Sequence, residues 1–293
     1  MKKPNFFILG APKSGTTSLA GWLADHPRIF MPREKEPQFF NWDFGNRKYR
    51  GLTSYEKLFA EAGPAHLAVG EATVRYLYSR CAVTAIERYV EGPRYIVLIR
   101  NPAEMAPSLH EQTMFTGDEN EPSFERAWAL QAVRAYGSHV PSSCRDPQIL
   151  QYGPLCRLGE QLDRLLRLVP GERVLILNLD QVRADPRREY MRVLDFLQVP
   201  DDGRAHFPVQ NTSKRRRFPV VWSSVRRLNR ALNDMGVPHV RLGVTAFIQA
   251  NTRQERQRAP LSEALRTELL RYFHDDVLLL EDLTGYDLSA WRE

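Results

Sequence analysis

One stretch near the N-terminus, from Phe6 to Thr17, constrains the fold of this chain most strongly. Residues 6–9 are all apolar, which is typical of a buried strand, and Gly10 and Gly15 bracket a turn before a helix predicted from Thr16. A strand that turns through glycines into a helix directs backbone N–H groups at one point, where the helix dipole also favours an anion. The stretch therefore predicts a phosphate- or sulfate-binding loop in an α/β fold.

The spacing inside this loop differs from that of a Walker A loop. In the Walker A pattern a lysine directly follows the second glycine, whereas here Thr16 takes that place and the lysine is Lys13, inside the turn. The alternative to anion binding is an ordinary strand-to-helix turn that uses glycines only for tightness. The residues expected to serve the anion are Lys13, Ser14, Gly15, Thr16 and Thr17.

Further apolar runs at residues 65–71, 95–99 and 174–177 predict buried strands, and they alternate with predicted helices at 54–61, 78–90, 154–169 and 186–197. This alternation predicts an α/β, P-loop-like, three-layer αβα fold with a central, mainly parallel sheet. The pattern stops near residue 200, and helices at 220–233 and 262–283 form a C-terminal helical extension. We expect one domain over residues 1–293, with an α/β core at 1–200 and a loop and helices at 201–293.

The net charge of +6 suits either a nucleic acid or a multiply anionic small molecule. No nucleic-acid-binding motif accompanies the charge, so we expect a small-molecule site and no nucleic acid. No apolar run approaches the roughly 18 residues of a membrane span. The histidines show no metal-ligand spacing, and no metal is predicted. Three scattered cysteines, Cys81, Cys144 and Cys156, favour reduced thiols in a cytoplasm.

Two other regions contribute candidate catalytic or binding residues near the loop. The charged segment 32–43 is irregular because of its prolines, and its aromatic residues Phe39, Phe40 and Trp42 favour burial, so Glu36 is either a presented catalytic carboxylate or a surface glutamate. The strand at 95–99 delivers Arg100 to the carboxyl edge of the sheet, where ligands of open α/β sheets bind. Arg100 is either a ligand residue or half of a structural ion pair. The helix that follows carries Ser108 and His110, and a packing role for His110 competes with catalysis.

Taken in order, these motifs resemble those of sulfotransferases that use 3′-phosphoadenosine 5′-phosphosulfate (PAPS), above all the heparan sulfate-type branch and its soluble bacterial relatives. The resemblance covers nearly the whole chain. It rests on the glycine loop with Leu19, Leu23, His26 and Pro27 after it, on the segment Lys35-Glu36-Pro37-Gln38-Phe39-Phe40, on Arg100-Asn101-Pro102 with Ser108, and on Ser213-Lys214-Arg215-Arg216 with Pro219.

The resemblance implies a transfer of the sulfuryl group from PAPS, with adenosine 3′,5′-bisphosphate (PAP) as product and without a metal. Glu36 is implied as general base, and Lys13 is implied to stabilise the leaving phosphate. Arg100 and Ser108 are implied to hold the 3′-phosphate, and Ser213, Lys214, Arg215 and Arg216 to close over the nucleotide, with Phe207 stacked on adenine. Residues expected at the acceptor are Glu71, Trp42, Tyr76, His110 and Phe115.

Several alternatives stay open at this point. A P-loop kinase would share the sheet and loop, and a non-catalytic anion- or nucleic-acid-binding module would explain the charge. If Glu36 is not the base, Glu71 or His110 is the next choice. The heparan-type enzymes often carry a lysine where this chain has Ala72, and Arg75 is a candidate to replace it. The acceptor is expected to be a small-molecule, lipid or glycan hydroxyl or amine.

Overall fold

The computed structural model describes residues 2–45, 47–144, 146–209 and 260–293. The chain divides into two compact units. The first comprises Met1–Ala106, Gly153–Gln210 and Glu263–Glu293, and the second comprises Pro107–Tyr152 and Asn211–Ser262. The single domain expected over residues 1–293 stays a prediction.

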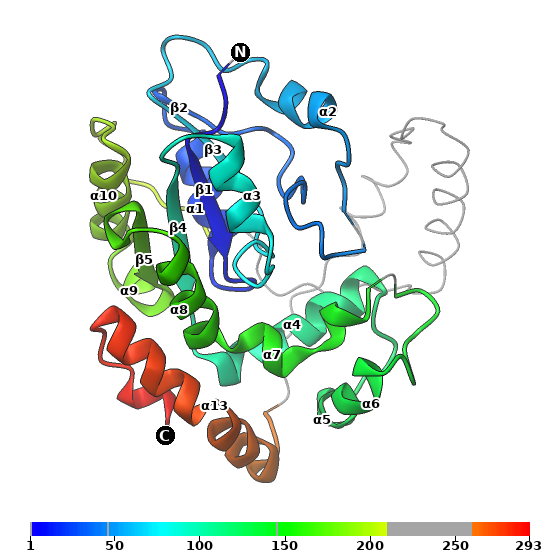
Figure 1. Ribbon diagram of the computed structural model, residues 1–293. Coiled ribbons are helices and arrows are strands. Elements are labelled where there is room, and N and C mark those ends of the chain that lie inside the picture. The colour runs from blue at the N-terminus through cyan, green and yellow to red at the C-terminus, as the bar shows by residue number, and fades with distance from the viewer. Residues whose placement is uncertain (1, 46, 145, 210–259) are drawn as a thin grey trace. The chain divides into compact units, whose positions relative to one another are not determined.

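The first unit is built on a five-stranded sheet in which all neighbouring strands are parallel (Figure 1). The strand order is β2-β3-β1-β4-β5. This confirms the expected parallel sheet, and only the two-residue strand β2 was not foreseen, because two residues are too few to show a pattern. The strands are β1 (Phe6–Gly10), β2 (Ile29–Phe30), β3 (Ala68–Ala72), β4 (Arg94–Ile99) and β5 (Val174–Asn178).

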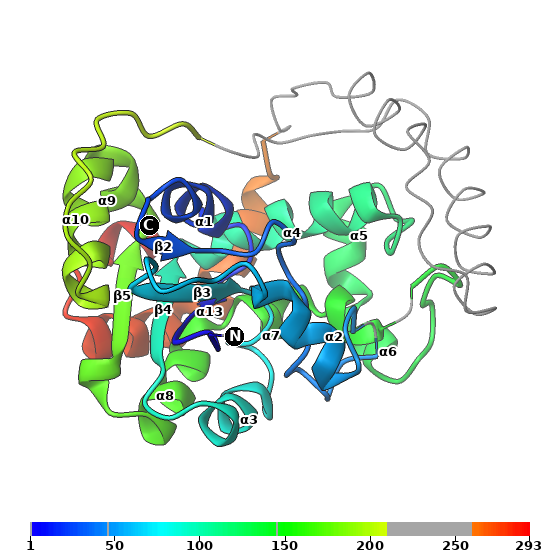
Figure 2. The ribbon, with the colours of Figure 1, turned by 90° about the horizontal axis from the view of Figure 1, so that it is seen from above.

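Helices cover both faces of this sheet, which is why the strands read as continuous apolar runs. Figure 2 shows α1 (Thr16–Ala24), α9 (Leu179–Ala184) and α10 (Pro186–Leu197) on one face and α3 (Ala82–Tyr89) and α8 (Leu158–Leu168) on the other. The expected three-layer arrangement is confirmed. In the core, side chains of β1 and β4 pack with Leu19, Trp22, Tyr190 and Leu194.

The C-terminal helix α13 (Glu263–Thr284), expected at 262–283, packs against α8. The Asp276 carboxylate accepts hydrogen bonds from the amides of Gly159 and Glu160, at 3.0 and 2.9 Å. These amides belong to the first turn of α8, where backbone donors have no partner inside the helix. The contact therefore caps α8 from a distant part of the chain.

Strand β1 lies in the middle of the sheet, with β3 on one side and β4 on the other. The chain first builds β2 and β3 on one side of β1 and then crosses to build β4 and β5 on the opposite side. In open α/β sheets ligands bind beyond the carboxyl ends of the strands at such a point of reversal. The fold therefore favours a site at the end of β1.

The remaining elements are short apart from one helix of 15 residues, Pro102–Thr116. Three predicted helices differ from the observed ones: the helix expected at 54–61 ends in a 3₁₀ turn at Lys57–Phe59, the helix expected at 78–90 spans only Ala82–Tyr89, and the helix expected at 154–169 is broken at Arg157. The helices not yet given are α2 (Leu52–Glu56), α4 (Pro102–Thr116), α5 (Phe124–Ala129), α6 (Gln131–Ala135) and α7 (Tyr152–Cys156), with further 3₁₀ turns at Pro147–Leu150, Gly171–Arg173 and Ser289–Trp291.

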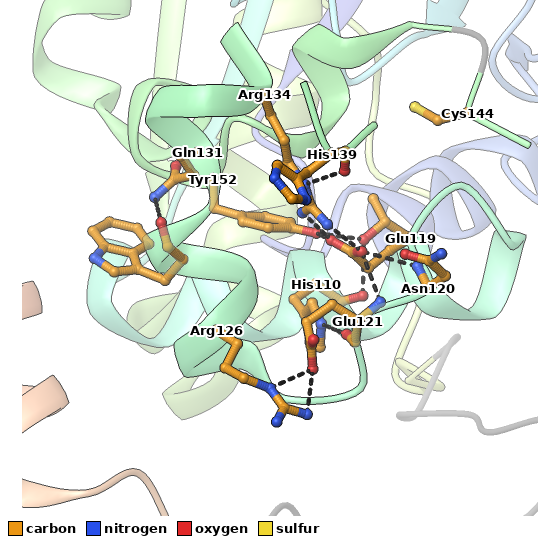
Figure 3. A network of polar contacts seen from close by, with 12 residues as sticks. His110, Glu119, Asn120, Glu121, Arg126, Gln131, Arg134, His139, Cys144 and Tyr152 are labelled. Carbon is orange, nitrogen blue, oxygen red and sulfur yellow. Dashed lines mark hydrogen bonds and ion pairs between the residues drawn. The ribbon is translucent and has the colours of Figure 1, made fainter. Parts of the chain in front are cut away.

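The second unit is held by a buried ion pair between Glu119 and Arg134 (Figure 3). Arg134 donates from Nη1 and Nη2 to the two carboxylate oxygens at 2.5 and 2.8 Å, and Tyr152 adds its hydroxyl at 2.7 Å. Arg134 Nε donates to the carbonyl of His139 at 3.2 Å. Burial raises the pKa of Glu119, but the hydrogen bonds from Arg134 and its neighbours outweigh burial and leave that pKa lowered.

Candidate functional site

The anion loop (residues 10–17) follows β1 and leads into α1. Gly15 precedes the helix with a φ of 87°, a value that favours glycine, and a Cβ there would lie 2.9 Å from Leu179 Cδ1. Within the described chain, α1 has no side-chain cap and no acidic residue in its first turn. Its N-terminal amides and the positive end of its dipole therefore favour an anion at this position.

Lys13 lies inside the turn of the anion loop, with a φ of 64°. Its backbone carbonyl accepts a hydrogen bond from Arg100 Nη1 at 3.0 Å. Arg100 directly follows β4, so this bond joins the loop to the neighbouring strand end. Two cationic residues expected from the sequence are thus brought to one edge of the sheet.

A second lysine, Lys35, reaches the same helix end, although the sequence reasoning assigned it no role. Its Nζ donates to Thr17 Oγ1 at 2.8 Å and lies 3.4 Å from Thr16 Oγ1. The same Nζ lies 3.6 Å from Glu36 Oε1. Burial lowers the pKa of Lys35, and Glu36 opposes that shift. The sequence feature that could have indicated a role for Lys35 is its position directly before Glu36.

Glu36 lies on an irregular segment, the Glu36 loop (residues 32–43), which contains no helix or strand, as expected. The amide of Glu36 donates to the carbonyl of Ala72, at the end of β3, at 3.0 Å. Its side chain is 33% exposed. Phe39 and Phe40 are buried and anchor the loop. The expectation that Trp42 is buried was wrong: it is 53% exposed, because a tight turn from its amide to the Phe40 carbonyl ends the anchored part.

Strand β3 carries a fully buried carboxyl group, Glu71. Hydroxyls of Tyr55, Thr73 and Tyr76 donate to it at 2.7, 2.6 and 3.3 Å. Burial raises the pKa of Glu71 to about 7, and the three hydrogen bonds oppose this shift. Glu71 and Tyr76 were expected at the acceptor. Both have 0% exposure, and a role at the acceptor stays a prediction for each.

Arg100 combines the two roles that the sequence left open. Its Nη2 pairs with Glu104 Oε2 at 2.9 Å, and its Nη1 serves the Lys13 carbonyl. Its Nε is buried and has no hydrogen-bond partner among the described residues. A buried donor of this kind calls for an acceptor, and the described residues do not supply one.

Two more expected residues of the first unit, Phe207 and Arg75, each contact an aromatic ring. The Phe207 ring packs edge-on against Trp22 and Tyr190, with centroids 5.1 and 5.4 Å away. The Arg75 guanidinium lies 5.7 Å from the centre of the Phe44 ring. Four residues of the expected nucleotide-closing segment, Ser213, Lys214, Arg215 and Arg216, lie outside the described residues, as does the helix expected at 220–233.

Three expected site residues that the structure describes belong to the second unit. Ser108 and His110 are buried on α4, and Phe115 is half-buried on the same helix. His110 Nε2 lies 2.8 Å from the carbonyl of Glu121, so this nitrogen carries the proton (Figure 3). Burial lowers the pKa of His110. The geometry shows the packing role that the sequence allowed for His110, and its role at the acceptor stays a prediction.

A known domain family matches most of the chain. Residues 3–227 match the family described as the sulfotransferase domain. The chain belongs to the sulfotransferase family. The anion loop, Lys35, the Glu36 loop, Glu71 and Arg100 all lie inside the matched range, so the edge of the sheet described above is part of the sulfotransferase domain.

Individual relatives agree with this assignment. The sulfotransferase is 28% identical over 194 residues to mouse heparan sulfate glucosamine 3-O-sulfotransferase 3B1, covering 66% of this chain and 46% of that protein. It is 28% identical over 204 residues to human bifunctional heparan sulfate N-deacetylase/N-sulfotransferase 3, covering 67% and 22%. The chain thus spans about half of the former and a smaller part of the latter.

A solved structure is similar over the full length. The sulfotransferase from Alicyclobacillus acidocaldarius superimposes with a TM-score of 0.74 at 25% identity, covering 100% of both chains. The sulfotransferase domain of the Synechococcus PCC 7002 olefin synthase shares the fold, with a TM-score of 0.52 at 19% identity over 98% of this chain and 97% of that one.

Two further findings concern the described ranges. No helix there is long and apolar enough to cross a bilayer. The same residues contain no cluster of three or more His, Cys, Asp or Glu side chains able to hold a metal ion.

Proposed function

We propose that this sulfotransferase moves a sulfuryl group from PAPS to a hydroxyl or amine of an acceptor, with Glu36 as general base. One observation carries the proposal: the Lys35 ammonium lies within 3.6 Å of both the Thr17 hydroxyl at the start of α1 and the Glu36 carboxylate. The Lys35 ammonium therefore contacts both the start of α1, where an anion is expected to bind, and the Glu36 carboxylate. Membership of the sulfotransferase family supports the donor chemistry.

The anion loop fits the phosphosulfate end of this donor. It combines the N-terminal amides of α1, the hydroxyls of Thr16 and Thr17 and the side chain of Lys13, and Lys35 of the Glu36 loop adds its ammonium. These groups are cations and hydrogen-bond donors, and helix N-termini of this kind bind sulfate and phosphate. Arg100 fits the 3′-phosphate, because its buried Nε has no partner among the described residues and guanidinium groups match phosphate geometry.

In this reaction the cationic groups of the site and the Glu36 carboxylate have different roles. When bound, PAPS supplies an activated sulfuryl group whose bond to the 5′-phosphate breaks as a bond to the acceptor forms. Lys13, Lys35 and the amides of α1 stabilise the negative charge that gathers on the departing phosphate. Glu36 removes the proton that the acceptor loses. The products are a sulfated acceptor and PAP, so atoms and charges balance without a further reactant.

The remaining assignments are part of the same proposal. Ser108, Phe207 and Ser213 to Arg216 keep their roles in nucleotide binding, and Trp42, Tyr76, His110 and Phe115 keep theirs at the acceptor. The acceptor is a glycan, lipid or small-molecule hydroxyl or amine, and the names of the heparan sulfate relatives favour testing glycans first. Three free cysteines favour a reducing compartment such as the cytoplasm.

Two experiments test the proposal. Calorimetric titration with PAP, PAPS and ATP with Mg²⁺ is expected to show binding of PAP and PAPS and much weaker binding of ATP. Incubation with PAPS and a panel of heparan oligosaccharides, phenols, alkyl alcohols and amines, read by mass spectrometry, is expected to show a sulfated product and PAP. Preference for ATP would indicate a kinase instead. Binding of PAP without turnover of any acceptor would indicate a non-catalytic anion-binding protein.

A further inference from the structure

The buried carboxyl group of Glu71 is the end point of a hydrogen-bond network under the Glu36 loop. Three hydroxyls point their protons at its two oxygens: Thr73 at Oε1, and Tyr55 and Tyr76 at Oε2. Glu71 has 0% exposure, so no acceptor molecule reaches its carboxylate in this arrangement. Its partners are therefore side chains of its own unit.

Two of these hydroxyls continue the network into the Glu36 loop. Tyr76 Oη accepts hydrogen bonds from the amides of Phe39 and Phe40 at 3.0 and 3.2 Å. Thr73 Oγ1 accepts from the amide of Gln38 at 3.4 Å. A hydroxyl has one proton and two lone pairs. Because both protons go to Glu71, both oxygens present their lone pairs to the loop.

The loop needs this support, because its backbone is unusual. Glu36 and Gln38 hold φ values of 57° and 52°, in the left-handed region that non-glycine residues seldom adopt. The ring of Phe39 stacks on Tyr55 at 4.4 Å and 11°. The direction of the amides after Glu36 is thus set by groups that all contact Glu71.

We propose that Glu71 is a positioning residue that, as a carboxylate, orients the Thr73 and Tyr76 hydroxyls and through them fixes the backbone that presents Glu36. The inference rests on the proposed function, in which Glu36 is the general base. Glu71 acts through two hydroxyls and three amides and does not touch the reacting atoms. A proton on Glu71 would make one of its oxygens a donor, and one of the three hydroxyls would then have to turn away.

The groups that face Glu71 make it sensitive to pH. Tyr55 and Tyr76 donate to Glu71. Burial raises the pKa of Tyr89, and Glu56 and then Glu71 add to that shift. The Glu36 carboxylate in turn raises the pKa of Glu71. With burial as the main cause, the pKa of Glu71 reaches about 7. The loop is therefore expected to loosen as pH falls through about 7.

The test measures hydrogen–deuterium exchange of the full chain bound to PAP. Glu71→Gln and Tyr76→Phe are expected to speed exchange at the Phe39 and Phe40 amides by about tenfold or more, because an ordinary hydrogen bond is lost. Tyr55→Phe is the matched control: it removes a donor to Glu71 but no acceptor of the loop, and is expected to have a smaller effect. Exchange unchanged within about twofold in both Glu71→Gln and Tyr76→Phe would overturn the inference.

Turnover with an acceptor from the screen separates this inference from the proposed function. If Glu71 works through Glu36, Glu71→Gln lowers kcat with little change in PAP affinity. Because the loop loosens below about pH 7, kcat of the unchanged protein is expected to rise through that pH, and Glu71→Gln removes this rise. In the double variant, Glu71→Gln adds no loss to that of Glu36→Gln. Additive losses would overturn the inference and leave Glu36 as base. Full turnover in Glu36→Gln, with a loosened loop in Glu71→Gln, would support the positioning contact and remove the base role of Glu36.

Discussion

The Lys35 ammonium lies 2.8 Å from the Thr17 hydroxyl, in the first turn of α1. This end of a helix carries the positive end of its dipole, so a cation there is unfavourable unless an anion lies between them. Burial also lowers the pKa of Lys35. The Thr17 hydroxyl and the Glu36 carboxylate, 3.6 Å away, stabilise the ammonium in part. A bound anion would stabilise it further, which is the property expected of a site for a multiply charged donor.

Lys35→Met is expected to lower kcat for sulfuryl transfer by about 10²-fold, as loss of one preorganised donor does elsewhere. Lys35→Arg should restore part of the loss. Lys48→Met serves as the control, because Lys48 lies in the next segment and pairs with Glu34 at the surface. Steady-state kinetics with PAPS checks the prediction, and equal effects of Lys35→Met and Lys48→Met would contradict it.

Glu36→Gln is expected to lower kcat by about 10²- to 10⁴-fold with the Kd for PAP nearly unchanged, because the amide keeps the shape of the side chain but cannot accept the proton. Glu34→Gln is the matched control on the same loop, where Glu34 accepts a hydrogen bond from Tyr49 at 2.6 Å. Kinetics and calorimetry on both variants test this. A turnover unaffected by Glu36→Gln would exclude Glu36 as the base.

Arg100→Ala is expected to weaken PAP binding by about 10- to 100-fold, the usual effect of losing hydrogen bonds to a charged group. Adenosine 5′-phosphosulfate lacks the 3′-phosphate, so its weaker binding should change much less. Comparing the two ligands matters because Arg100 also holds the Lys13 carbonyl, and a disturbed anion loop would weaken both. Equal losses for both ligands would argue against contact with the 3′-phosphate.

The stability of the protein is expected to depend on pH through Glu71. Its pKa rises from an ordinary 4.5 to about 7 on folding, so the folded state binds a proton between these values when the unfolded state does not. The free energy of unfolding therefore gains at most about 3 kcal/mol as pH falls from 7 to 4.5. Glu71→Gln should remove this slope. Urea unfolding of both proteins between pH 5 and 8.5 measures it, and parallel curves would contradict the prediction.

Arg134→Met is expected to lower the free energy of unfolding by about 3 to 5 kcal/mol, because it leaves the Glu119 carboxylate buried without its partner. Arg134 and Glu119 are 1% and 0% exposed. Arg126→Met is the control. Arg126 pairs with Glu121 at 2.9 Å but is 68% exposed, so a loss of at most about 1 kcal/mol is expected. Urea unfolding measures both free energies, and similar losses in the two variants would contradict the prediction.

Much of the fold could be predicted because its signals are local. The apolar runs of β1, β4 and β5 and the helix Pro186–Leu197 lie where the pattern placed them, since burial on both faces and helical periodicity act over neighbouring residues. The missed strand β2 has two residues, and among the described strands it pairs with β3 alone. Its existence depends on a neighbour far along the chain.

The candidate site likewise contains residues that local patterns predict and contacts that they do not predict. Glycines, a lysine and two threonines in the order found from Gly10 to Thr17 predict an anion loop, because this spacing aims backbone donors at one point. Glu36 and Arg100 could be chosen from their places after strands and turns. No local pattern indicated that Lys35 bonds to Thr17, since 18 residues separate them.

The sequence by itself therefore determined the sheet class, the anion loop and the candidate base, because each is written in short-range patterns. Only the tertiary structure decided that Glu71 is sealed beneath the Glu36 loop, that Trp42 is exposed, and that Lys35 links Glu36 to the start of α1. Those outcomes depend on which strand ends become neighbours, and packing between distant segments settles that. The ends of β1, β3 and β4 meet at one edge only once the parallel sheet has formed.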